Sequence, residues 1–182
     1  MTPEDIRRLA GSAPERWREL ELLHRSGDED VRATLHHGEL DAIRLSDGHR
    51  IRERGAPPSS WGVRPLEPYP TNYAWSAMLD PYELTRGVAI TDVRRHELFG
   101  RPVAAFVARA VPGYDPVCSC CPLVFSAESQ RLEHGEDWTA RPGELPDGVD
   151  LALDLEIGIV VSSRDRGGRL GHWFTNEILR VA

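Results

Sequence analysis

Residues 31–54, with the sequence VRATLHHGELDAIRLSDGHRIRER, contain the pattern that decides the fold class. Val31, Ala33 and Leu35 alternate with polar residues, which is typical of a strand that buries one face. Asp47 and Gly48 then form a strong hairpin-turn signal. We therefore predict three short antiparallel strands across this stretch, with Asp47-Gly48 closing a hairpin.

Apolar runs and turn signals continue through the second half of the chain. Phe99-Gly100 is predicted to join two strands, and residues 165–168 (DRGG) are predicted to close the last hairpin. About eight or nine strands are expected, a number that suits one sheet. The predicted fold class is α+β, mainly β, in a single domain over residues 1–182. Besides the stretch above, the expected strands cover residues 88–98, 101–110, 122–133, 149–164 and 172–181.

Residues 3–25 have the features of a helical segment. Two prolines each suit a first helical turn, and the apolar residues form a stripe near a 3.6-residue period. We predict one or two short helices here, with a break near residues 11–14.

A second helical segment is predicted over residues 73–86, around Pro81, with Asp80 as its candidate cap. The proline-rich residues 55–72 precede it and are predicted to form a long, stiff loop. Long loops inside compact domains are more often functional than merely connecting.

The composition is that of an ordinary globular protein. The 182 residues are 40% hydrophobic and 28% charged, and a domain of about this size folds without disulfides or metals. The formal net charge is −7, and every basic residue is an arginine. An acidic chain with dispersed arginines matches a phosphate backbone poorly, so we expect no nucleic-acid partner.

The start of the chain shows no basic segment followed by an apolar run, and no stretch of about 18 apolar residues occurs. We therefore predict no membrane span and a cytoplasmic location, where cysteines are reduced by default. An open sheet would expose strand edges, which makes a homodimer plausible.

The order of several motifs resembles the lipoprotein-carrier (LolA-like) half-barrel superfamily over roughly residues 30–182. The motifs are LSDGHRI at 45–51, LDPYEL at 79–84, GRPV at 100–103, LDLEIGIV at 153–160 and HWFTNEI at 172–178. The resemblance implies a curved antiparallel sheet whose concave face holds an apolar ligand, with helices across the mouth. Family members are typically exported, so the predicted cytoplasmic location favours a different cargo.

Aromatic residues crowd the middle of the chain. They are predicted either to pack as ordinary core or to form a lid over a small-molecule pocket. In the second case the ligand-binding residues are Trp61, Tyr69, Tyr73, Trp75, Met78 and Tyr82, with Trp173 from the last strand.

Cys118, Cys120 and Cys121 lie within four residues. They are candidate ligands of a soft metal ion, candidate partners in a disulfide or redox switch, or structural thiols. Adjacent residues on a strand point to opposite faces, so Cys120 and Cys121 are expected to diverge while Cys118 and Cys120 share a face.

A few histidines and carboxylates are candidate acid–base groups, namely His36, His37, Asp80 and His172. His36 and His37 are adjacent on a predicted strand, so one of them would face the concavity. Asp154 and Glu156 share one strand face. They would form an acid–base pair if that face is concave, or a solvated surface if it is convex.

The sequence contains no nucleophile elbow, phosphate-binding loop, dinucleotide fingerprint or metalloprotease helix, and no cofactor is predicted. The leading hypothesis is a protein that binds a hydrophobic small molecule in the concave face of a half-barrel. One alternative is an enzyme of specialised metabolism, of cyclase or isomerase type, using a histidine or carboxylate in that cavity. Another is a metal- or redox-responsive protein acting through Cys118, Cys120 and Cys121.

Overall fold

The computed structural model describes residues 1–27, 29–54, 73–116 and 119–182. Nine strands in these residues form one antiparallel sheet in the order β4-β3-β2-β1-β9-β8-β7-β6-β5. The strands are β1 (Glu19–Ser26), β2 (Asp30–His36), β3 (Glu39–Arg44), β4 (Arg50–Arg54), β5 (Val88–Leu98), β6 (Arg101–Ala110), β7 (Val149–Asp154), β8 (Val160–Asp165) and β9 (Trp173–Val181).

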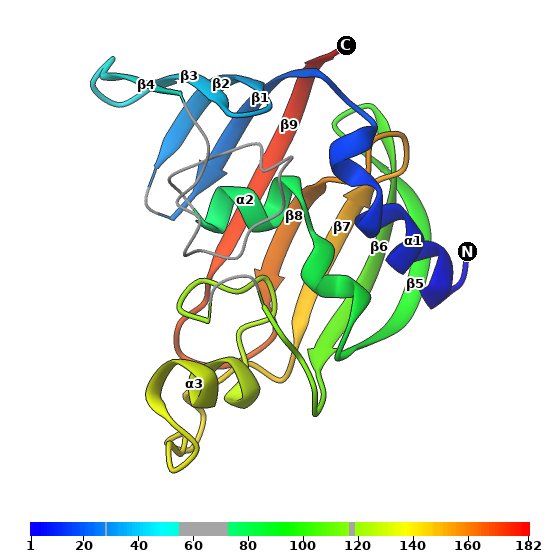
Figure 1. The fold of residues 1–182 in the computed structure, drawn as a ribbon, viewed down its shortest axis with the longest axis vertical. Coiled ribbons are helices and arrows are strands. Elements are labelled where there is room, and N and C mark those ends of the chain that lie inside the picture. The colour runs from blue at the N-terminus through cyan, green and yellow to red at the C-terminus, as the bar shows by residue number, and fades with distance from the viewer. Residues whose placement is uncertain (28, 55–72, 117–118) are drawn as a thin grey trace.

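The sheet consists of two runs of consecutive antiparallel strands, β1 to β4 and β5 to β9. The first and last strands, β1 and β9, pair with each other and join the two runs. The strands β4 and β5 lie at the two edges, so the described strands make an open, bent sheet (Figure 1). The predicted α+β, mainly-β class is confirmed.

The described residues also contain α1 (Pro3–Gly11), η1 (Ala13–Glu15), α2 (Tyr73–Leu79), η3 (Tyr82–Thr85) and α3 (Ala127–His134). Figure 1 shows α1 and α2 on the same side of the sheet, with α2 in front of β8 and β9. The helix α2 contacts β8, and α1 contacts both η3 and β5. Within the described part of the chain, no helix is long and apolar enough to cross a membrane.

The helix α1 begins at a capping box. The Thr2 hydroxyl accepts a hydrogen bond from the Asp5 N–H, and the Asp5 carboxylate accepts one from the Thr2 N–H. The helix packs closely on the turn between β7 and β8, where Gly158 has φ +79°. A Cβ at Gly158 would lie 2.7 Å from the carbonyl oxygen of Leu9, so only glycine fits there.

The strands β3 and β4 confirm the predicted hairpin, and Gly48 has the positive φ of 71° that such a turn needs. The strands β5 and β6 meet at Phe99-Gly100, also as predicted, and the last hairpin joins β8 to β9. The helical prediction for residues 73–86 holds as α2 and η3. The cap of η3 is Pro81, however, and Asp80 is not its cap.

The prediction of helix for residues 3–25 is wrong beyond residue 15. Residues 19–26 form β1, in which Leu20, Leu22 and His24 are buried while the residues between them are partly exposed. This is a two-residue period, which the adjacent apolar pair Leu22-Leu23 obscures. Pairing with β2 on one side and β9 on the other satisfies the backbone of β1 and outweighs any helical preference.

The prediction of a strand over residues 122–133 is also wrong. The chain is irregular until Ser126, whose hydroxyl accepts a hydrogen bond from the Ser129 N–H and caps α3. The Ser129 hydroxyl in turn faces the Ser126 backbone N–H, which completes a capping box built from two serines. Serine is an unusual residue at the second capping position, so the helix start has no strong sequence signal.

Candidate functional site

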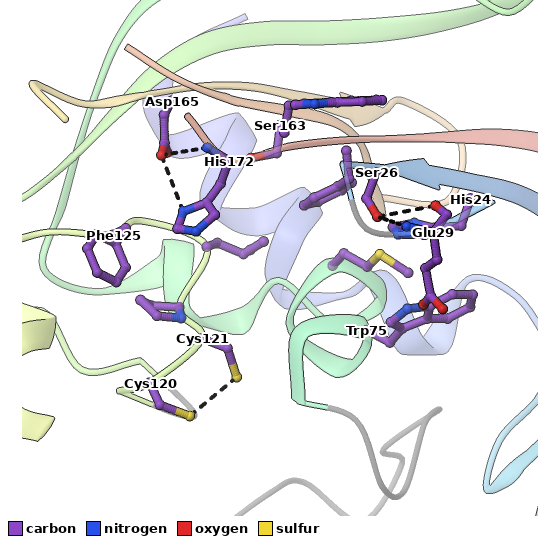
Figure 2. A pocket seen from close by; sticks show the side chains of 15 residues that line it. His24, Ser26, Glu29, Trp75, Cys120, Cys121, Phe125, Ser163, Asp165 and His172 are labelled. Atoms are coloured by element: carbon purple, nitrogen blue, oxygen red, sulfur yellow. Dashed lines mark hydrogen bonds and ion pairs between the residues drawn. The ribbon is translucent and has the colours of Figure 1, made fainter. Parts of the chain in front are cut away.

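A cavity of about 380 Å³ lies between α2, the segment 120–125 and the strands β1, β8 and β9. Its walls are largely aromatic and aliphatic, and its apolar residues are Trp75, Met78, Pro122, Leu123, Phe125, Trp173 and Phe174. Its polar residues are His24, Ser26, Glu29, Ser163, Asp165 and His172, together with the thiols of Cys120 and Cys121. In Figure 2, His24 and Trp75 lie on one side of the cavity, with Asp165 and His172 on the other.

His24 is the most deeply placed polar residue of this cavity, with only 6% of its surface exposed. Its Nδ1 lies 2.8 Å from Oδ1 of Asn176, which is fully buried. The Asn176 amide nitrogen lies 2.7 Å from the Val160 carbonyl oxygen and 3.2 Å from the Met78 sulfur. Because that nitrogen must donate to the carbonyl, Oδ1 is the amide atom that faces the histidine.

This arrangement fixes the tautomer of His24. Since Asn176 Oδ1 can only accept, the histidine Nδ1 carries the proton and donates. In the neutral ring, Nε2 then holds a lone pair. Burial lowers the pKa of His24, and the hydrogen bond that its Nδ1–H donates to Asn176 opposes that effect only in part. At neutral pH the ring is therefore uncharged, and its second nitrogen is a hydrogen-bond acceptor.

Aromatic side chains surround the His24 ring. The Trp75 ring centroid lies 4.9 Å away and that of Phe174 lies 5.7 Å away, both tilted against the imidazole. Trp75 belongs to α2 and Phe174 to β9, so the helix and the sheet meet at this histidine. A low-polarity setting of this kind strengthens any hydrogen bond that Nε2 accepts.

His172 and Asp165 form a polar pair on the other side of the cavity. The His172 Nδ1 lies 3.3 Å from Asp165 Oδ2, and the same oxygen accepts a hydrogen bond from the His172 N–H at 3.0 Å. The Asp165 side chain is buried while that of His172 is largely exposed. The Phe125 ring stands edge-on to the imidazole at 5.7 Å. These contacts hold the His172 ring at the edge of the cavity.

One cavity wall is held by a buried polar network. Glu83 Oε1 accepts hydrogen bonds from the Tyr114 hydroxyl at 2.7 Å and from the Leu123 N–H at 2.5 Å. The Tyr114 oxygen accepts from the Val124 N–H at 3.2 Å. Burial and the nearby Glu83 charge raise the pKa of Tyr114 well above its ordinary value, so the hydroxyl remains a donor. The network fixes the backbone of Leu123 and Val124 without help from a strand.

Cys120 and Cys121 lie in a turn and not on the extended strand assumed for their side-chain directions, and their sulfur atoms are 3.7 Å apart. The expectation that adjacent cysteines diverge is therefore wrong, because it holds only on an extended strand. Cys118 lies outside the described residues. Among the residues that the structure describes, no group of three or more histidine, cysteine, aspartate or glutamate side chains is placed to hold a metal ion.

The cavity brings together several of the residues singled out from the sequence, namely Trp75, Met78, Trp173, His172, Cys120 and Cys121. Trp61 and Tyr69 lie outside the described residues, and so does the side chain of Tyr73. Tyr82 is 37% exposed on η3, and the buried Asp80 follows α2; neither lines the cavity.

His36 and His37 lie at the far end of β2, away from the cavity. The His37 ring stacks on Trp17 at 4.7 Å, and its Nε2 lies 3.1 Å from the Trp17 carbonyl oxygen. His36 borders a second, polar concavity of about 860 Å³ on β2 to β4. This second concavity is lined mainly by charged side chains, in contrast to the apolar walls of the first cavity. Ion pairs compensate these charges, such as the 2.5 Å contact between Arg50 and Asp41.

Asp154 and Glu156 form neither an acid–base pair in the concavity nor a shared solvated surface, the two arrangements expected from the sequence. Asp154 is fully buried and accepts two hydrogen bonds from Arg101, from Nε at 2.5 Å and from Nη2 at 3.1 Å. It also accepts from the backbone N–H groups of Glu156 and Ile157. Glu156 is exposed and pairs with Arg101 as well. The group therefore ties β6 to the β7–β8 turn and lies outside the cavity.

His24 and Asn176, the central polar residues of the cavity, are not among the residues predicted from the sequence. A signal for His24 exists, because it continues the alternation of Leu20 and Leu22 on the buried face of β1. A histidine in that position is a polar group on a core face and requires a partner. The helical interpretation of residues 3–25 hid this alternation.

No family model and no curated protein matches the sequence. Among solved structures, the chain is similar to the crystal structure of MucB in complex with MucA(peri), with 13% identity and a TM-score of 0.49, covering 100% of this chain and 56% of that one. It is also similar to a crystal structure of MucB, with 14% identity and a TM-score of 0.46, covering 96% of this chain and 56% of that one. A third similar structure is the Pseudomonas aeruginosa MucA/MucB complex, with 15% identity and a TM-score of 0.46, covering 96% of this chain and 55% of that one. The chain thus spans about half the length of these proteins.

Proposed function

We propose that the cavity around His24 binds a small hydrophobic molecule that carries one hydroxyl or N–H group. The observation that carries this proposal is the buried histidine whose Nδ1 is engaged by Asn176, leaving the lone pair of Nε2 as the acceptor in an aromatic wall. Ligand sites are typically mostly apolar cavities of about 300–1,000 Å³ with a few fixed polar groups, and this cavity has that size and composition.

The walls favour a flat ligand. Trp75 and Phe174 present rings close to the histidine, and Trp173 and Phe125 add further aromatic surface. Offset or edge-on contacts between aromatic rings contribute about 0.5–1.5 kcal/mol each beyond the area that they bury. The rings supply most of the affinity for such a ligand, and Nε2 selects its orientation.

The proposal predicts a preference between ligands of equal shape. Isothermal titration with 1-naphthol and with 1-methylnaphthalene compares a donor group with a methyl group of similar size. A site built to accept a hydrogen bond discriminates against the analogue that lacks the donor, because its buried acceptor is then left unpaired; we expect at least about tenfold weaker binding of the methyl compound. The variant His24→Phe is expected to remove that preference while retaining affinity for both.

The control is His96→Leu, which changes a histidine exposed on β5 and should leave both affinities unchanged. Absence of saturable binding for both compounds would count against a hydrophobic site. Equal binding of the two compounds to the wild-type protein would count against the role of His24.

A second candidate function is acid–base catalysis on a bound ligand, favoured by the presence of two oriented histidines on one cavity. His24 offers a neutral acceptor, and Asp165 holds His172 at the opposite side (Figure 2). An isomerase uses two such groups, one to remove a proton from the ligand and one to return a proton to it. Incubation with 2-tetralone in D₂O tests it: deuterium should enter the ligand faster than in buffer, and both His24→Phe and His172→Phe should slow the exchange. Exchange at the buffer rate would exclude this activity for enolisable ketones.

A further inference from the structure

Cys120 and Cys121 are consecutive cysteines whose thiols face each other in a turn. The Cys120 S–H donates to the Cys121 sulfur across 3.7 Å, and both residues border the cavity around His24 (Figure 2). Cys120 is exposed and Cys121 is half-buried. Two thiols that already touch, one of them open to solvent, meet the geometric requirement for a two-electron oxidation site.

We propose that Cys120 and Cys121 form a reversible oxidation site that a hydroperoxide converts to a disulfide between neighbouring residues. In the first step, the Cys120 thiolate attacks one peroxide oxygen, the O–O bond breaks, and Cys120 sulfenic acid and hydroxide form. In the second, the Cys121 sulfur attacks the Cys120 sulfur and the sulfenic hydroxyl leaves as water. Two thiols and one hydrogen peroxide thus give one disulfide and two waters, with two electrons passing to the peroxide.

The difference in exposure assigns the two roles. Peroxide reaches Cys120 directly, because this residue lies on the surface, whereas Cys121 is partly covered by its neighbours. Of the thiols that the structure describes, that of Cys121 lies 3.7 Å from the Cys120 sulfur, a distance that makes the second step intramolecular and fast. Cys120 is therefore the residue that meets the oxidant, and Cys121 resolves it.

The product is a strained disulfide that reducing agents open easily. Neighbouring Cα atoms are about 3.8 Å apart across a trans peptide, which is shorter than the roughly 4.4–6.8 Å that ordinary disulfides span. Strained disulfides have higher reduction potentials and belong to the labile, regulatory class. This chemistry suits a reversible modification and would be a poor structural crosslink.

Oxidation at this site also alters the proposed ligand cavity. The backbone that follows is fixed, because Leu123 and Val124 donate hydrogen bonds to Glu83 and Tyr114. The movement that brings the sulfurs together therefore falls before Leu123, and Cys120, Cys121 and Pro122 belong to the cavity wall. This coupling rests on the proposed ligand binding, whereas the oxidation itself does not.

Mass spectrometry of the peroxide-treated protein tests the oxidation. The variant Cys118→Ser retains only the two thiols of the proposed site, so its tryptic peptide should lose the mass of two hydrogens and regain it with dithiothreitol. In Cys118→Ser/Cys121→Ser, dimedone should label Cys120 after peroxide treatment. In the matched variant Cys118→Ser/Cys120→Ser, Cys121 should be labelled several-fold more slowly.

Disulfide-linked dimers of Cys118→Ser, or its direct oxidation to sulfinic acid, would overturn the proposal. Preferential dimedone labelling of Cys121 would overturn the assigned roles. Titration of 1-naphthol into the reduced and oxidised forms then tests the coupling: a several-fold change in affinity supports it, and equal affinity refutes it. If neither form binds the compound while the disulfide still forms, the proposed function fails and the oxidation site stands.

Discussion

The contact between His24 and Asn176 can be tested by a double-mutant cycle, in which the structure sets the sign of the coupling. The variant His24→Phe leaves one buried acceptor, Asn176 Oδ1, without its donor. The variant Asn176→Leu leaves two groups, the Nδ1–H of His24 and the carbonyl oxygen of Val160. The double variant leaves only that carbonyl. The two single changes together thus leave three buried polar groups without a hydrogen-bond partner, and the double variant leaves one.

A buried polar group without its partner costs about 1–3 kcal/mol. The single variants together leave two more groups unpaired than the double variant does, which corresponds to about 2–6 kcal/mol. Coupling between residues in contact is usually about 0.5–3 kcal/mol, so the double variant should be more stable than the sum of the single effects predicts by about 2–3 kcal/mol. Both substitutions replace a buried side chain with a slightly bulkier apolar one, so neither creates a cavity. For a protein of this size, each kcal/mol corresponds to about 2–4 °C in Tm.

Urea unfolding at pH 7.5, followed by tryptophan fluorescence and by circular dichroism, measures the four free energies of unfolding. Agreement of the two probes is needed before a two-state value is taken. His96→Leu, on the exposed face of β5, is the control and should change stability by less than about 0.5 kcal/mol. Additive effects of His24→Phe and Asn176→Leu would refute the assigned tautomer and the hydrogen bond on which the proposed function depends.

Three further predictions concern stability. Burial lowers the pKa of folded His24 from 6.5, so the contribution of His24 to the free energy of unfolding is fully present above pH 6.5 and is lost as the pH falls below that value. Urea unfolding of the wild type from pH 7.5 to 5 should show this loss. An equal pH dependence of the free energy of unfolding in the wild type and in His24→Phe would contradict the prediction. Asp154→Ala leaves Arg101 and two backbone donors without their buried acceptor and should lower the free energy of unfolding by about 3–5 kcal/mol, measured in urea; a loss below 1 kcal/mol would contradict it. Tyr114→Phe removes the donor to Glu83 and should cost about 1–3 kcal/mol, with faster amide exchange at residues 123–124; unchanged exchange would show that the network does not hold that wall.

Local patterns determined the parts of the fold that could be predicted. The Asp47-Gly48 and Phe99-Gly100 turns each contain a glycine at positive φ, and both hairpins formed where expected. The errors lie where local signals conflict with tertiary pairing. Residues 19–26 have an apolar content that suits either period, and their strand conformation depends on two partners distant in sequence.

The cavity was only partly predictable for a related reason. Trp75, Met78 and Trp173 are conspicuous as large side chains near the expected lid, and they do line the cavity. Cys120 and Cys121 are conspicuous too, but their convergence depends on a turn that has no proline or glycine at its centre to mark it. Strand geometry was assumed for these two residues, and it gives the opposite orientation for adjacent side chains.

A β-bulge explains why the pair at the centre of the cavity could not be deduced even from the correct strands. Near its beginning, β1 pairs Glu21 with Arg180, and continuation of that register would place His24 opposite Glu177. The register shifts between Glu21 and Leu22 by one residue of β9, so His24 lies opposite Asn176. Directly opposed residues share a face, and Asn176 is buried whereas Glu177 is not. One extra residue of β9 in its central pairing with β1 thus supplies an amide, in place of a residue from the solvent face, to a histidine 152 positions away. The neutral, oriented His24 depends on that shift, and no composition or spacing in either strand reports it.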